Sequence, residues 1–185
     1  MKAALPYRIR NIIYILILSC TSIVMPAQIL EISSNNKAIN YPEYTEAKNF
    51  YRKKQADKVE EWLTVVLQKL KDGGHTEDYI ELLFHRGKNL LNLFRTDDAM
   101  EVFIELRNLS KINNLPNMEA EAIQALNVIY TFKNDNAARV LILNSAVKIK
   151  GLSDENYSDA CSSLASSLKA RSKLDSALFL SLIHI

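Results

Sequence analysis

Apolar residues recur at steps of three and four along most of this chain, the spacing of one face of an α-helix. The run between residues 80 and 94 consists of Ile80, Leu83, Phe84, Gly87, Leu90, Leu91 and Phe94. The chain has no long alternating run typical of a β-strand, and only four Gly and four Pro occur in 185 residues. So few turn formers argue against a β-sandwich or barrel. The pattern therefore predicts an all-α protein.

Helix-breaking and capping residues divide the chain into about eight helices of about 10–19 residues. Pro42 opens the first, because proline is tolerated at the start of a helix. Gly151 is expected to end a helix and Ser153 to cap the next one. The other breaks are expected at Gly73-Gly74, before Thr76, and at residues 113–116.

Three polar turns share a pattern, since each contains an Asp and is followed by Ala99, Ala137 or Ala177. A small residue lies twelve positions before each of these alanines, and a large apolar residue follows the first two by four positions. Small residues let two antiparallel helices approach closely, and a bulky side chain then fills the remaining gap. The expected packing residues are Gly87, Ala99, Phe103, Ala125, Ala137, Leu141, Ala165 and Ala177.

These helix–turn–helix units resemble tetratricopeptide repeats, in which a small residue is followed by an alanine after a polar turn and then by an aromatic residue. Counted from Lys58, which stands in place of the alanine in a weaker upstream copy, the spacings are 41, 38 and 40 residues. They exceed the usual value of about 34, as in long-helix variants of the family. The resemblance covers residues 42–179 and implies antiparallel helix hairpins stacked as a right-handed α-solenoid. An irregular helical bundle is the alternative. The expected units are 42–72, 76–112, 116–150 and 153–179, after a linker at 28–41.

The resemblance also implies a concave groove, lined by the first helix of each pair, that binds a protein or peptide ligand. The groove candidates are Glu81, Phe84, Lys88, Asn92, Asp159, Ser162, Ser166 and Lys169. Ordinary solvated helix positions are the alternative interpretation of these residues.

No pattern of catalytic residues is evident in the sequence. Cys161 lies among small residues of a helix with no histidine nearby, which favours packing over nucleophilic chemistry. His85, on the polar side of its helix, is expected to be solvated or to line the groove. His75 and His85 do not have the sequence spacing of the histidines in a known metal-binding motif. We therefore expect no enzyme activity, no metal and no cofactor.

Charge argues against nucleic-acid binding. Residues 1–27 contain three basic side chains and no acid, so residues 28–185 carry 20 basic and 21 acidic groups. A near-neutral body lacks the basic surface that a phosphate backbone requires.

The beginning of the chain resembles a secretory signal. Three positive charges precede an apolar run from Ile12 to Met25, which is shorter than the roughly 20 residues that span a bilayer. We expect a signal peptide at residues 1–27, cleaved after Ala27, and export to the periplasm or the outer side of the membrane. The alternative is an imperfect lipobox with lipidation at Cys20.

The last six residues, 180–185, read LSLIHI, and their codons resemble a sequencing-library adapter read in frame. On this interpretation the chain is a gene fragment whose missing part could attach it to a membrane. A leader followed by such repeats resembles the extracytoplasmic sensory or scaffolding part of a signalling protein. The alternative is a stand-alone periplasmic or lipid-anchored assembly factor.

Overall fold

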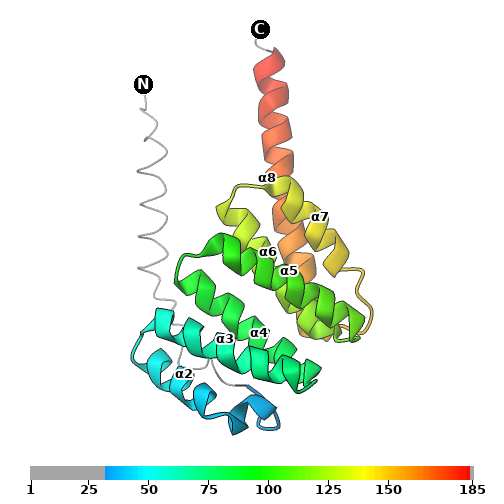
Figure 1. Cartoon of the computed structure of the whole chain (residues 1–185). Coiled ribbons are helices and arrows are strands. Elements are labelled where there is room, and N and C mark those ends of the chain that lie inside the picture. Colours follow the sequence, from blue (N-terminus) through cyan, green and yellow to red (C-terminus); the bar gives the residue numbers. More distant parts are fainter. Residues whose placement is uncertain (1–31, 184–185) are drawn as a thin grey trace. The chain divides into compact units, whose positions relative to one another are not determined.

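A computed structural model describes the backbone of residues 32–183 and the side chains of residues 32–169. The described part contains seven α-helices, one short 3-10 helix and no strand, so the all-α prediction is confirmed. Consecutive helices lie side by side in chain order (Figure 1). The elements are η2 (Lys37–Asn40), α2 (Pro42–Arg52), α3 (Ala56–Asp72), α4 (Thr76–Asn92), α5 (Thr96–Ile112), α6 (Pro116–Phe132), α7 (Asn136–Ala146) and α8 (Asp154–Ile183).

The helices repeat with a period of 20 residues. Each of α3, α4, α5 and α6 has 17 residues, and a three-residue turn follows each of them. The middle residue of every turn from α2 to α7 has a left-handed backbone, at Lys54, Gly74, Phe94, Asn114 and Asn134. In each turn the next residue donates its N–H to the carbonyl five residues earlier, as Arg95 does to Leu90 at 3.0 Å. This bond satisfies a carbonyl that the helix end would otherwise leave unpaired.

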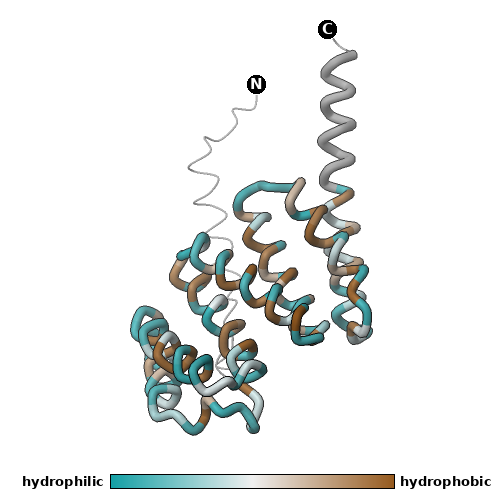
Figure 2. The backbone as a smooth tube through the Cα atoms, turned by 45° about the vertical axis from the view of Figure 1, so that its right-hand side comes forward, coloured by the Kyte–Doolittle hydropathy of each residue, from teal (hydrophilic) through white to brown (hydrophobic). Residues whose placement is uncertain are grey.

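The core follows the same 20-residue period. The helices from α3 to α7 carry both hydrophobic and hydrophilic residues (Figure 2). The eighth residue of each of these helices is apolar and 0% exposed. These residues are Leu63, Leu83, Phe103, Ile123 and Leu143. A hairpin of two helices therefore repeats every 40 residues, with one central core residue from each helix.

A small or medium-sized residue is buried at one recurring position in the first helix of each pair. The positions are 40 residues apart, at Ala47, Gly87, Asn127 and Ser167. At Gly87 a Cβ atom would lie 2.6 Å from Cζ of Phe103, closer than side chains tolerate. The absence of a side chain at Gly87 thus makes room for the Phe103 ring on α5.

Of the predicted packing residues, those on α4 and α5 are buried, and those beyond α5 are out of register with the helices. Gly87, Ala99 and Phe103 are buried, whereas Leu141 is 75% exposed. The sequence pattern places the next unit 38 residues on, while the hairpins recur every 40, so the residues predicted beyond α5 lie two positions early. Ala125 is half-buried and Ala165 is exposed, and the buried residues two positions after Ala125, Leu141 and Ala165 are Asn127, Leu143 and Ser167. Ala137 is exposed, and two positions after it lies the half-buried Arg139.

Helix α8 differs from the expected fourth unit. It runs from Asp154 to Ile183 without the turn predicted at residues 172–176. That segment contains no Gly, Asn or Pro, the residues that most often end a helix. Ala177 lies in this helix, but its side chain is outside the described residues. The predicted signal peptide at 1–27, with Cys20 and Ala27, also lies outside them.

Phe94 is the residue least suited to its backbone conformation. It has a φ of 58° and its side chain is 79% exposed. The left-handed conformation costs a residue with a Cβ atom about 1–2 kcal/mol, and glycine avoids this cost. We expect Phe94→Gly to raise the free energy of unfolding by about 1 kcal/mol, measured by urea denaturation. Phe94→Ala retains the strain and serves as the control; an equal gain in both variants would contradict a backbone origin.

Candidate functional site

The predicted groove residues lie on α4 and α8, the first helices of two pairs. On α4, Glu81, Phe84 and Lys88 are half-buried and Asn92 is exposed. On α8 the four candidates are exposed: Asp159, Ser162, Ser166 and Lys169. With α6, which lies between them in chain order, these helices form what we call the α4–α6–α8 face.

Lys88 links α4 to α6 on this face. Its Nζ atom lies 4.1 Å from the centroid of the Phe84 ring, and that ring meets Phe103 edge-on at 6.2 Å. Burial lowers the pKa of Lys88, and the nearby carboxylate of Glu121 on α6 acts in the opposite direction. The Phe84 ring stabilises the ammonium group of Lys88, whose hydration is reduced by burial. These two predicted groove residues therefore form one small amphipathic surface.

A polar cavity of about 270 Å³ lies between α6 and α8. It is lined by Glu121, Gln124, Asn156, Asp159, Ser162 and Ser163. The hydroxyl of Ser163 donates to Oε1 of Gln124 at 3.2 Å, while the buried Nε2 of Gln124 has no partner among the described residues. Two of the groove candidates on α8, Asp159 and Ser162, therefore line this cavity, whereas Ser166 and Lys169 do not.

Glu81 is already engaged by the N-terminal segment of the chain. Its carboxylate accepts the main-chain N–H of Ser33 at 2.6 Å and the side-chain amide of Asn36 at 2.8 Å. The amide of Asn36 also donates to the carbonyl of Asp78 at 3.2 Å. Residues 33–36 form a turn closed by the N–H of Asn36 and the carbonyl of Ser33 at 2.9 Å.

The predicted linker at 28–41 is therefore structured where it is described. Its helix η2 packs against α2, α3 and α4, and Ala38 is 0% exposed. The sequence contains one signal for this arrangement, since Asn36 is a residue type that caps turns and helices. Here its Oδ1 accepts the N–H of Ala38 at 2.8 Å.

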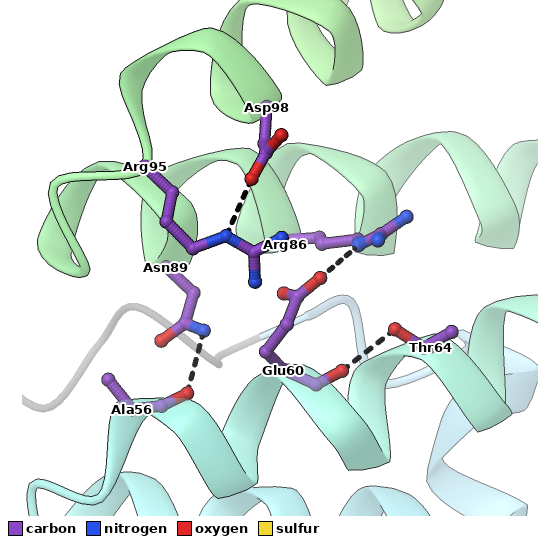
Figure 3. Close-up of polar contacts among 7 residues, drawn as sticks. All are labelled: Ala56, Glu60, Thr64, Arg86, Asn89, Arg95 and Asp98. Atoms are coloured by element: carbon purple, nitrogen blue, oxygen red, sulfur yellow. Dashed lines mark hydrogen bonds and ion pairs between the residues drawn. The ribbon is translucent and has the colours of Figure 1, made fainter.

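A second cavity, of about 220 Å³, lies between α4 and α5 and has a different character. Its two arginines are both paired (Figure 3): Arg86 donates to Glu60 at 2.7 Å and Arg95 to Asp98 at 2.6 Å. Asn89, beside them, donates to the carbonyl of Ala56 at 3.1 Å. These contacts join α3, α4 and the beginning of α5, which favours a structural role for this cluster.

The expectation that His85 is solvated or lines the groove is wrong. Its side chain is 7% exposed, and its Nδ1 atom is buried without a hydrogen-bond partner in the described part of the chain. Burial, with a smaller contribution from Lys88, lowers the pKa of His85 to about 4. His85 is therefore a neutral core residue at neutral pH.

Cys161 is half-buried and not in a disulfide. Between residues 32 and 169 no group of His, Cys, Asp and Glu side chains is arranged to hold a metal ion. Within the same range, no helix has the combination of length and apolarity needed to cross a bilayer. Comparisons of the chain with known protein families, curated proteins and solved structures give no match.

Proposed function

We propose that this chain is a protein-interaction module that binds peptide segments on the α4–α6–α8 face and acts by binding, without catalysis. One observation carries the proposal: Glu81 on α4 holds a peptide turn, residues 33–36, of the same chain. A helix face that binds main-chain N–H groups in this way has the chemistry needed to recognise an extended or turning partner segment.

Two further features support a binding surface here. The Phe84–Lys88 pair offers an aromatic ring and a partly dehydrated cation. The cavity between α6 and α8 contains carboxylate, amide and hydroxyl groups. The α4–α5 cavity is a weaker candidate because its arginines are satisfied by acids of this chain.

The resemblance to tetratricopeptide repeats belongs to the same proposal. Its support is the 40-residue hairpin period, with Gly87 making room for Phe103 between α4 and α5. The apolar leader supports export to the periplasm or the outer side of the membrane. In that setting we propose that the module is the sensory or scaffolding part of a signalling protein.

A peptide selection against the whole chain tests this function. We expect selected peptides to lose about ten-fold or more in affinity with Lys88→Glu, because the change reverses a charge beside Phe84 and opposite Glu121. Binding is measured by fluorescence anisotropy. Lys111→Glu, the same charge change at an exposed position of α5, is the control and should have little effect. If no peptide is selected, or if both variants behave alike, the proposed face is wrong.

A further inference from the structure

Glu81 and Glu121 occupy equivalent positions in the repeat. Each is the sixth residue of its helix, α4 or α6, and they are 40 residues apart, which is the period of one hairpin. Both side chains are half-buried. What the protein does at Glu81 is therefore a guide to what Glu121 can do.

At Glu81 the recognised structure is a turn that presents two donors to one carboxylate. The N–H of Ser33 donates to Oε1, and the amide of Asn36 donates to Oε2. Hydrogen bonds to an ionised acceptor are roughly twice as strong as neutral ones.

At Glu121 the carboxylate faces a cavity instead of a turn. No described residue donates a hydrogen bond to Glu121 or to Asp159 across the cavity, although both acids line its 270 Å³. The nearby cation is Lys88, on the Phe84 ring. The unpartnered Nε2 of Gln124 adds a buried donor that a peptide carbonyl would satisfy.

We propose that the cavity between α6 and α8 binds a turn of a partner peptide, with Glu121 in the role that Glu81 has for residues 33–36. Glu121 accepts a main-chain N–H and a side-chain amide of the partner. Asp159, the second acid of the cavity, pairs with a basic side chain next to the turn. The partner is thus an Asn-containing turn followed by Lys or Arg. This inference rests on the proposed function, because it names the ligand of the same face.

The probe is a labelled peptide with the sequence of residues 32–41, ISSNNKAINY, which contains the turn and a lysine directly after Asn36. Its affinity for the whole chain is measured by fluorescence anisotropy. We expect Glu121→Gln to weaken binding about ten-fold or more, since it removes a charged acceptor while retaining shape. Asp159→Asn should weaken binding less, because its ion pair is exposed. Glu101→Gln, at the sixth position of α5, is the matched control and should change nothing.

A second peptide, with Ala in place of Asn36, separates specific recognition from general charge attraction, because the change leaves the charge of the peptide unaltered. It lacks the amide donor, so we expect about ten-fold weaker binding to the wild-type chain and little further loss with Glu121→Gln. The inference is overturned if the first peptide fails to bind, if Glu121→Gln leaves its affinity unchanged, or if only Glu81→Gln affects it. The last result would mean that the probe replaces residues 33–36 instead of entering the cavity. If selected peptides remain sensitive to Lys88→Glu in those cases, the proposed function survives and only this inference fails.

Discussion

Gly87→Leu is expected to lower the free energy of unfolding by about 3 kcal/mol, the upper end of the usual cost of overpacking a core. A Cβ atom alone would lie 2.6 Å from Cζ and 2.7 Å from Cε1 of Phe103. Phe103 is 0% exposed, so its ring has no free space to move into. The gain in helix propensity from replacing glycine is about 1 kcal/mol and offsets only part of the clash.

A double-mutant cycle checks the cause of this loss. Phe103→Leu removes the ring that the new side chain would meet, so adding it to Gly87→Leu should recover part of the lost stability. We expect a coupling energy of about 1 kcal/mol or more between the two positions, measured by urea denaturation of the four proteins. Strictly additive losses would mean that Gly87 and Phe103 do not limit how closely α4 and α5 approach.

The helices themselves could be predicted because their signals are local. Gly74 provides the left-handed residue that ends α3, with a φ of 69°. Ser153 precedes α8, and its Oγ accepts the N–H of Asn156 at 3.3 Å. Each of these depends on one residue type in one backbone conformation, and such preferences are legible without knowledge of the tertiary structure.

The 20-residue register was not predicted because the five turns share a backbone conformation and not a sequence. Lys, Gly, Phe and Asn all occupy the left-handed position, so a search for similar turn residues has nothing constant to follow. The recurring alanines after polar turns instead indicate Ala137 as the residue equivalent to Ala99. The position 40 residues after Ala99 is Arg139, which donates to Asn127 at 3.1 Å.

Residues of the candidate site could be predicted from the sequence only where they lie together on a single helix. Asp159 and Ser162 lie on one face of α8, and both line the cavity. Occupation of Glu81 by residues 33–36 could not be predicted, because those residues are 45 or more positions away in sequence. The burial of His85 could not be predicted for a related reason. The pattern of apolar residues shows which side of α4 is apolar, but it does not show that η2, α3 and α5 all pack against this helix.

The buried histidine makes stability depend on pH. Burial keeps the pKa of His85 at about 4 in the folded chain, against 6.5 for an unperturbed histidine. Between these two pH values the unfolded chain binds a proton that the folded chain does not, so stability decreases as the pH falls. The contribution is complete above pH 6.5 and is lost on the way to pH 4. A difference of this size corresponds to about 3 kcal/mol.

His85→Leu is expected to remove this dependence. At pH 7 the variant should be at least as stable as the wild type, because it replaces an unpartnered buried Nδ1 with an apolar group. At pH 4 it should exceed the wild type by about 3 kcal/mol. The measurement is urea denaturation at pH 7 and pH 4. His75→Gln, which changes the half-buried histidine before α4, should retain the wild-type slope. Parallel pH profiles for wild type and His85→Leu would mean that His85 binds a proton as readily in the folded chain as in the unfolded chain, and so is not sealed in the core between α4 and its neighbours.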